Sequence, residues 1–274
     1  MSMILQLKDI RLSFTNAHNE TLDLLQGVNL DVEKGKMTAL VGGNGTGKTT
    51  LFNIISGFQK GYRGEVVFEG KSLNRLPAHK ISLMGIGRLF QGGQLFAGLT
   101  LMENLKIASD DTTGESPFSL FSRPLATRAV EVEREQRARE VLERLFGADN
   151  KYQTMLDHEA SAFSYGEQRL LSLARLLMGN DRLLLLDEPT SGVNPVYVET
   201  IANIISQMVS EGIAVLLIEH NMQFVRQVAD VCAYLDDGKI TKVGTTTEVL
   251  NDQQVRNSYL GVSATELDKL KVER

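Results

Sequence analysis

The sequence has a single cysteine, Cys232, among 274 residues. One thiol excludes an intramolecular disulfide and a cysteine-held metal cluster, and it fits a reducing compartment. Long hydrophobic runs are also absent: Leu183–Leu186 and Ile213–Ile218 are far shorter than the roughly 20 residues of a membrane-spanning helix. The N-terminal stretch alternates apolar and polar residues and lacks the apolar core of a secretory signal. We therefore expect a cytoplasmic protein without a membrane segment of its own.

Basic residues are in deficit, with 29 Lys and Arg against 34 Asp and Glu, which gives a formal net charge of −5. Nucleic-acid binding depends on basic surface that neutralises phosphates, so this balance argues against nucleic acid as the main partner. Hydrophobic residues make up 42% of the chain, which is enough for a substantial core. The length allows one large domain or two small ones.

The most informative stretch is a glycine-rich loop that links a strand pattern to a helix pattern. Met37–Val41 is largely apolar, as in a strand buried on both faces of a parallel sheet, and Leu51, Ile54 and Ile55 recur at helical spacing. Between them lie Gly42, Gly43, Asn44, Gly45, Thr46, Gly47, Lys48, Thr49 and Thr50. In this context the spacing G-x-x-x-x-G-K-[ST] predicts a nucleoside triphosphate site, in which backbone N–H groups and the helix N-terminus bind phosphates.

Two side chains of this loop have specific expected roles. Lys48 is predicted to reach the β- and γ-phosphates, and the hydroxyl of Thr49 is predicted to bind Mg²⁺. The alternative is a glycine-rich turn with a chance lysine. The complete spacing between a strand and a helix argues against that alternative.

A second apolar run, Leu183–Leu186, is followed directly by Asp187 and Glu188. A carboxylate at the C-terminal end of a parallel strand lies at the same sheet edge as the phosphate loop. Asp187 is predicted to bind Mg²⁺, directly or through a water, and Glu188 is predicted to face the γ-phosphate and an attacking water. Two acidic residues can also simply mark the end of a strand. Their combination with Lys48 and Thr49 favours the functional interpretation.

Three further side chains are candidates by position. His220 follows the apolar run Ile213–Ile218, where an imidazole can reach the γ-phosphate, although a structural hydrogen bond is the commoner role. Gln91 follows another predicted strand, and its amide can contact Mg²⁺ or the nucleophilic water. Phe14, at the end of the first strand pattern, is either a core residue or a ring that stacks on adenine.

The N-terminal part predicts an antiparallel sheet. Residues 4–14, 22–32 and 65–69 alternate in part between apolar and polar side chains, as strands with one solvated face do. A polar turn is expected at Asn16–Asn19. In the last third, strand patterns at 183–186, 213–218, 231–235 and 239–243 alternate with helix patterns at 198–209 and 223–228. This alternation predicts an α/β fold.

Between residues 92 and 160 the pattern is helical. Thr100 and Glu103 predict a capped helix, and the polar stretch 110–124 predicts a surface excursion. Residues 126–147 predict a helix whose apolar face consists of Ala138, Val141, Leu142 and Leu145. Its charged face predicts the i,i+4 ion pairs Glu133–Arg137, Glu135–Arg139 and Glu140–Arg144. We assign no chemistry to that face.

A second anion-binding helix end is expected at Phe163–Gln168, which precedes the helical stretch Arg169–Met178. Ser164 and Gly166 stand at its N-terminus, where free N–H groups favour an anion. A chain with one phosphate loop and a second phosphate-binding helix end suggests that the two act between subunits.

Taken together and in this order, the motifs resemble those of ATP-binding-cassette (ABC) ATPases, over about residues 4–250. Residues 42–49 correspond to the Walker A loop, Gln91 to the Q-loop, 163–168 to the signature, 183–187 to Walker B, Glu188 to the catalytic glutamate, 191–194 to the D-loop and His220 to the switch histidine. The resemblance implies ATP and Mg²⁺ as cofactors. It implies Thr49, Gln91 and Asp187 as metal ligands, and Glu188, His220 and Gln91 as catalytic residues. Nucleotide contacts would come from Phe14, residues 42–50, Ser164, Gly166 and Glu167.

The resemblance also implies an architecture and partners. The expected fold is one ABC domain over residues 1–274, with a P-loop NTPase core on a mostly parallel sheet, an antiparallel β subdomain, an inserted helical subdomain at about 92–170 and a helical extension at 248–274. A second ATPase subunit, identical or different, would complete a head-to-tail dimer, in which each ATP lies between one Walker A loop and the other signature. Permease subunits would hold the chain at the cytoplasmic face of the plasma membrane. An importer would also depend on an external solute-binding protein.

Departures from the family pattern are few. Phe163 and Tyr165 replace the usual leucine and glycine of the signature, Asn194 replaces the usual aspartate of the D-loop, and Phe14 replaces the commoner tyrosine. The Ser-Tyr-Gly-Glu-Gln signature, the run 192–195 and the ending 258–261 resemble the ATPases of branched-chain amino acid and urea importers. The alternatives are an exporter of lipid or polysaccharide, and a soluble ABC protein of ribosomes or chromosomes. Against the last, the chain has neither two cassettes nor a long coiled coil.

Overall fold

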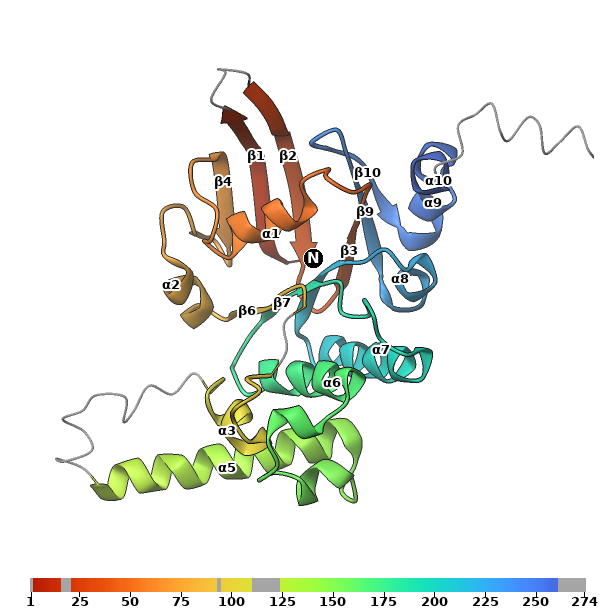
Figure 1. Cartoon of the computed structure of the whole chain (residues 1–274). Coiled ribbons are helices and arrows are strands. Elements are labelled where there is room, and N and C mark those ends of the chain that lie inside the picture. The colour runs from red at the N-terminus through yellow and green to blue at the C-terminus, as the bar shows by residue number, and fades with distance from the viewer. Residues whose placement is uncertain (1, 16–20, 93–94, 110–123, 261–274) are drawn as a thin grey trace, which may run out of the picture.

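A six-stranded sheet in the order β10-β9-β3-β8-β7-β6 carries most of the predicted motifs (Figure 1). The computed structural model describes residues 2–15, 21–92, 95–109 and 124–260. The strands are β3 (Met37–Val41), β6 (Ile86–Leu89), β7 (Leu183–Asp187), β8 (Ala214–Ile218), β9 (Val231–Asp236) and β10 (Lys239–Thr245). All neighbours pair in parallel except β10, which pairs antiparallel with β9. Every residue of β3, β7 and β8 is buried, which explains their continuous apolar runs.

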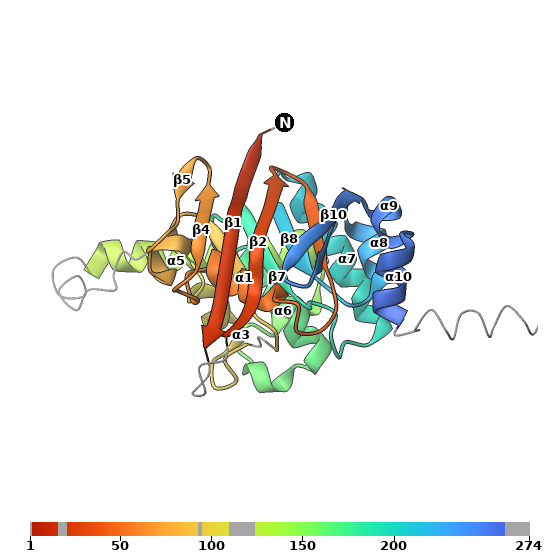
Figure 2. The ribbon, with the colours of Figure 1, turned by 90° about the horizontal axis from the view of Figure 1, so that it is seen from above.

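An antiparallel sheet in the order β2-β1-β4-β5 lies over one side of the helix α1 (Lys48–Ile55). Its strands are β1 (Met3–Thr15), β2 (Thr21–Glu33), β4 (Arg63–Phe68) and β5 (Lys71–Ser72). In Figure 2 the strands β4, β1 and β2 run side by side in front of α1. Their buried residues, such as Leu5 and Leu7, pack with α1 and with one face of the six-stranded sheet. The predicted antiparallel sheet is thus confirmed; the predicted turn at 16–19 lies outside the described residues.

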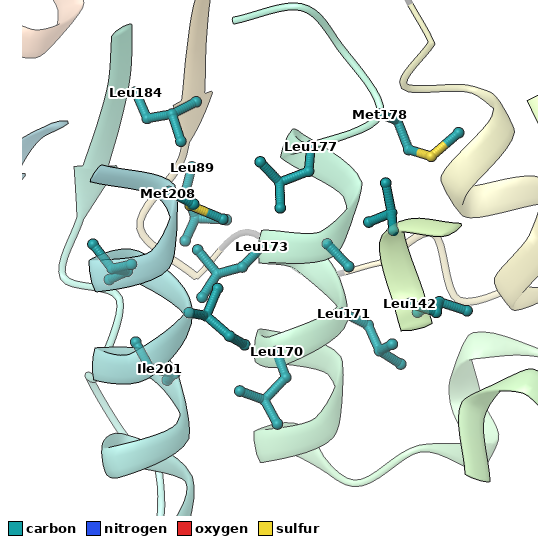
Figure 3. Close-up of a cluster of buried hydrophobic side chains, with 14 of the residues drawn as sticks. Leu89, Leu142, Leu170, Leu171, Leu173, Leu177, Met178, Leu184, Ile201 and Met208 are labelled. Carbon is teal, nitrogen blue, oxygen red and sulfur yellow. The ribbon is translucent and has the colours of Figure 1, made fainter. Parts of the chain in front are cut away.

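Helices cover the opposite face of the six-stranded sheet. They are α3 (Leu101–Lys106), α5 (Pro124–Phe146), α6 (Tyr165–Leu176) and α7 (Pro195–Ser210), with the short 3-10 turns η1 (Lys151–Thr154) and η2 (Ala160–Ala162). Figure 3 shows Leu170 and Leu173 of α6 among Leu184 of β7, Met208 of α7 and neighbouring apolar side chains. These residues form one core with Leu142 of α5.

The strands β7 and β8 separate two hydrophobic cores. Leu184 and Leu186 of β7 belong to the core with the helices α5, α6 and α7, whereas Leu183 and Leu185 belong to the core with α1 and the antiparallel sheet. This division follows from the period of two along a strand, which sends successive side chains to opposite faces.

Smaller helices complete the fold. They are α2 (Ala78–Leu83), α8 (Met222–Val228), α9 (Thr246–Leu250) and α10 (Gln253–Leu260). Side chains of α8 and α9 pack with β3 and β9 in a third apolar cluster. α2 was not anticipated from the sequence, because its six residues are too few to display a helical period. The predicted extension 248–274 contains α10; residues 261–274, and with them the end of the chain, lie outside the described part.

In the helical part, some of the local predictions are confirmed, one helix begins earlier than predicted, and others stay untested. The capping box of Thr100 and Glu103 is present, and the helix predicted at 126–147 is α5, which runs from Pro124 to Phe146 with Ala138 and Leu142 buried. The helix predicted from Arg169 begins at Tyr165 instead, because Ser164 caps it. The excursion predicted at 110–124 falls almost wholly outside the described residues, and the helical subdomain boundaries at about 92–170 stay a prediction.

The predicted ion pairs of α5 were mostly wrong. Glu135 and Arg139 pair as expected, at 3.0 Å. Arg137 instead donates to the carbonyl of Gly179 at 2.9 Å, and Arg144 pairs with Glu211 at 3.1 Å. Both arginines reach groups on other segments, which a pattern confined to one helix does not reveal.

Within the described residues, no helix combines the length and the hydrophobicity that crossing a membrane requires.

Candidate nucleotide-binding site

The loop after β3 depends on glycine at three positions. Gly45 and Gly47 have φ of 78° and 102°, a region that side-chain-bearing residues rarely adopt. At Gly42 an added Cβ would lie 2.2 Å from the carbonyl oxygen of Leu235, on β9. The loop therefore lies close to β9 and has left-handed backbone conformations at Gly45 and Gly47, and α1 begins directly after it at Lys48.

Lys48 lies inside this loop, and its side chain is almost buried. Its Nζ donates to the carbonyl oxygens of Gly42, at 2.8 Å, and Gly43, at 2.7 Å. Burial lowers the pKa of Lys48, although the nearby carboxylates of Glu188 and Asp187 act in the opposite direction. The ammonium group therefore sits where the loop and the start of α1 converge, a position from which it can meet a phosphate.

An open cavity of about 840 Å³ joins the loop to the ends of the other motif-bearing segments. Its lining residues are Leu24, Asn44, Gly45, Gly47, Lys48, Thr49, Thr50, Gln91, Glu188 and His220. Most of the predicted site residues thus share one cavity, as expected where parallel strands end at the same sheet edge.

Two of the predicted catalytic side chains, Gln91 and His220, both contact the third, Glu188. The Nε2 of Gln91 donates to its Oε2 at 3.0 Å, and the Nε2 of His220 lies 3.1 Å from its Oε1. The backbone of Glu188 is left-handed, with φ of 48°, and its N–H donates to the carbonyl of Ile218 at 2.9 Å. A carboxylate held in this way beside a phosphate loop can orient and polarise a water molecule.

Asp187, the last residue of β7, is fully buried. Neither carboxylate oxygen has a hydrogen-bond partner, and the closest cation is Arg88, whose Nη2 lies 3.5 Å from Oδ2. Burial raises the pKa of Asp187, and Arg88 opposes this effect.

Mg²⁺ fits this arrangement. Asp187 does not line the cavity, but its buried carboxylate oxygens lack hydrogen-bond partners, and Thr49 and Gln91 in the cavity wall carry side-chain oxygens. Such hard oxygen donors are the ligands that Mg²⁺ prefers. No cluster of three His, Cys, Asp or Glu able to hold a metal occurs in the described part of the chain. An ion here would therefore complete its coordination with phosphate oxygens and water, as Mg²⁺ commonly does. When bound, it would neutralise charge on the phosphates.

Comparisons with known proteins agree with this geometry. Residues 25–191 match the ABC transporter family. The chain belongs to the ABC transporter family. It is 36% identical over 248 residues to the probable branched-chain amino acid transport ATP-binding protein LivG of Archaeoglobus fulgidus, covering 90% of this chain and 93% of that protein. It is 34% identical over 241 residues to the lipopolysaccharide export system ATP-binding protein LptB of Haemophilus influenzae, covering 87% and 91%.

Among solved structures, the ADP conformation of MJ1267, an ATP-binding cassette of an ABC transporter, superposes with a TM-score of 0.79. It shares 32% sequence identity, and the match covers 96% of this chain and 100% of that one. The predicted fold and activity are thereby confirmed: this chain is an ABC ATPase.

The ABC signature lies apart from the cavity. Ser164 is exposed and caps α6: its Oγ accepts from the N–H of Glu167 at 3.4 Å, while the carboxylate of Glu167 accepts from the N–H of Ser164 at 2.8 Å. Burial opposes the shift, but hydrogen bonds from Lys151 and Ser164 leave the pKa of Glu167 lowered. A Cβ on Gly166 would lie 2.4 Å from the ring of Tyr197, so a larger residue there would require that ring to move. Ser164, Gly166 and Glu167 do not line the cavity of their own chain.

Two of the departures, Tyr165 in the signature and Asn194 in the D-loop, have structural explanations. The hydroxyl of Tyr165 donates to the carbonyl of Ser191 at 3.2 Å, so it connects the two motifs within one chain. Asn194 caps α7 by accepting from the N–H of Val196 at 3.0 Å. Because asparagine and aspartate are about equally good N-caps, the helix start is preserved.

Phe14 is not a core residue, since 44% of its surface is exposed. It pairs with Leu22 across the β1–β2 ladder and is not among the residues that line the cavity. Its predicted stacking on adenine stays a prediction.

Sequence reasoning missed three buried charged residues. Arg88 contacts Asp187, and Glu219 accepts from the backbone N–H groups of Thr190 at 2.9 Å and His220 at 2.9 Å. Arg169 of α6 donates to the backbone carbonyls of Asp187, at the end of β7, and of Glu188 and Pro189, just after it. The available signal was a charged side chain within, or directly after, an otherwise apolar strand or helix face.

We predict that Arg169→Met lowers the free energy of unfolding by about 2–4 kcal/mol, because several buried carbonyls lose a charged donor. Arg169 donates to the carbonyl oxygens of Glu188 at 2.7 Å and Pro189 at 3.0 Å. Arg169→Lys keeps the charge but lacks the planar guanidinium group, so its free energy of unfolding should lie between those of the parent and the Met variant. Urea unfolding monitored by circular dichroism measures the effect. Equal stability of the Met variant and the parent would contradict this role.

Proposed function

We propose that this ABC ATPase powers solute import through a separate membrane permease, with branched-chain amino acids or a related small polar solute such as urea as cargo. One observation carries the enzymatic part: Gln91 and His220 converge on Glu188 in the cavity that also contains Lys48. The cargo class is supported by the similarity to LivG of Archaeoglobus fulgidus. The similarity to LptB keeps export of a lipid as the second candidate.

In this proposal ATP binds with its phosphates on the Walker A loop, and Lys48 contacts the β- and γ-phosphates. Thr49, Asp187 and Gln91 hold Mg²⁺. Glu188 activates the attacking water, and His220 lies beside it to contact the γ-phosphate. Ser164, Gly166 and Glu167 bind the nucleotide of a second ATPase subunit, while Phe14 stacks on adenine.

A groove on the helical side is the proposed contact with the permease. It encloses about 680 Å³ between α2, β6, α6 and the segments before and after α3, and Leu83, Phe96 and Ile107 contribute exposed apolar surface to it. A short cytoplasmic helix of the permease would fit such a partly apolar groove. This contact would hold the chain at the cytoplasmic face of the membrane.

We predict that Ile107→Glu reduces co-purification with the permease at least about tenfold, because it buries a charge in the proposed contact. Ile107 is 60% exposed and does not line the nucleotide cavity. Val243→Glu, at a comparably exposed apolar position on β10, is the matched control. Undiminished recovery of the permease with Ile107→Glu would contradict the assignment of the groove.

Transport in proteoliposomes tests the proposed function itself. The chain is reconstituted with the permease subunits that co-purify with it, and ATP-dependent uptake of labelled leucine and urea is measured with and without a solute-binding protein. Uptake that requires both ATP and the binding protein is the expected result. ATPase activity that responds to a lipid substrate, with no solute uptake, would instead favour export.

A further inference from the structure

Arg88 is a buried cation fixed between α1 and the end of β7. Its side chain is 6% exposed, and that of Asp187 is 1% exposed. One guanidinium nitrogen, Nη1, donates to Oδ1 of Asn53 at 2.8 Å and to Oγ of Ser56 at 2.7 Å. The other, Nη2, lies 3.5 Å from Oδ2 of Asp187. The arginine therefore ties the Walker A helix to the Walker B carboxylate.

Two aromatic rings also lie beside the guanidinium group of Arg88, which lines the groove between α2 and α6 as well. The guanidinium lies 4.5 Å from the ring centroid of Phe90 and 5.7 Å from that of Phe52. Burial lowers the pKa of Arg88, while Asp187 opposes this effect. A cation in such a place is retained only with a partner, because an unpaired buried charge is strongly unfavourable.

Asp187 has the same need for a counter-charge. Lys48 is nearby, but its Nζ donates to the carbonyls of Gly42 and Gly43. Arg88 is thus the ion-pair partner of Asp187, although the contact is not a hydrogen-bonded fork, since both carboxylate oxygens lack a hydrogen-bond partner. A carboxylate contacted by a single cation at 3.5 Å keeps its oxygens available to a second cation.

We propose that Arg88 is a positioning residue, the resident counter-ion that holds Asp187 in place until a divalent cation becomes the carboxylate's partner. This inference rests on the proposed role of Asp187 in binding Mg²⁺. Asn53 and Ser56 keep the guanidinium in place whether or not the metal is present. Because α1 begins with Lys48 and Thr49, the same contacts fix Asp187 relative to the hydroxyl that is proposed to share the metal.

The competing explanation is that Arg88 only fastens α1 to β6. In that case its removal lowers stability by the same amount with and without Mg²⁺, and the charge on Asp187 is irrelevant. In the counter-ion explanation, metal-free protein suffers most, because Asp187 is left as an uncompensated buried charge.

The test measures thermal unfolding in the Glu188→Gln background, so that ATP is not consumed. Arg88→Met should lower the melting temperature by roughly 10 °C when ATP is present with a chelator. Adding Mg²⁺ should then raise it more in this variant than in the parent, since the metal replaces the missing charge. Arg139→Met, which removes an exposed pair with Glu135, is the control and should shift the melting temperature by at most about 3 °C.

A double variant separates charge compensation from simple fastening. In metal-free protein, Asp187→Asn added to Arg88→Met should restore at least about half of the lost melting temperature, because neither charge then remains. Arg88→Lys, which keeps the charge, should restore part of it in the presence of Asp187. If Arg88→Met does not accumulate as folded protein, recovery of folded protein by the double variant supports the inference, and failure to recover overturns it.

The outcomes also separate this inference from the proposed metal site. A Mg²⁺-dependent rise of equal size in parent and Arg88→Met, with no recovery in the double variant, overturns the inference alone. If Mg²⁺ raises the melting temperature of neither protein, two claims are overturned: that Arg88 is the counter-ion of Asp187 until the metal binds, and that Asp187 binds Mg²⁺.

Discussion

Replacing Glu188 by glutamine is expected to reduce the rate of ATP hydrolysis by about 10²–10⁴-fold, the usual contribution of a general base. Gln91 and His220 contact both oxygens of the Glu188 carboxylate, so the amide keeps its place but loses the charge that polarises water. ATP should still bind, because Lys48 and the Walker A loop are untouched. Steady-state phosphate release and equilibrium binding of a fluorescent ATP analogue measure the two effects separately.

Two comparisons sharpen this experiment. Lys48→Ala should weaken nucleotide binding itself, because it removes the cation at the phosphate position. Glu211→Gln changes a carboxylate that pairs with Arg144 far from the cavity and should leave turnover unchanged. Hydrolysis at the parent rate by the Glu188→Gln variant would show that another group activates the water.

Mixing two inactive variants, Lys48→Ala and Ser164→Arg, is expected to restore occluded nucleotide at one site per dimer. Ser164 is exposed at the start of α6 and does not line the cavity of its own chain. If Ser164 contacts the nucleotide of a second subunit, one site of a mixed dimer contains both substitutions. The other site contains an intact Lys48 and an intact Ser164. Retention of labelled ATP after rapid gel filtration is the measurement.

Occlusion is a better readout than turnover, because the two sites of a dimer can depend on each other. Each variant alone is the control and should retain no nucleotide. A chain that dimerises but shows no occlusion in its mixed dimers would disprove action between subunits. If the chain does not dimerise alone, a different ATPase chain is the partner and the same pair of substitutions is divided between the two chains.

Much of the cavity followed from local patterns. β3 and β7 are buried on both faces, so their apolar runs stand out in the sequence. β7 ends at Asp187, and the glycine-rich loop after β3 leads to Lys48. The parallel arrangement then requires these ends to meet. The convergence of Gln91 and His220 on Glu188 follows the same logic, although the contacts of about 3 Å depend on the complete fold.

Contacts between distant segments could not be predicted in this way. Arg88, Arg137 and Arg169 each bind groups from other elements, so the sequence around them carries no sign of the partner. Phe14 shows the converse limitation: an aromatic residue at a strand end is compatible with burial and with exposure, and only the packing of its neighbours decides. In this chain it is exposed.

The two faces of β7 and β8 have a thermodynamic consequence. Because one set of strands lines both large cores, the loss of either core exposes half the side chains of the same strands. Neither the helical side nor the antiparallel sheet then retains a complete hydrophobic surface to pack against. Unfolding of the isolated chain should therefore be a single cooperative transition, and a destabilising substitution deep in α5 or α7 should lower the population of competent nucleotide sites as much as one beside the phosphate loop.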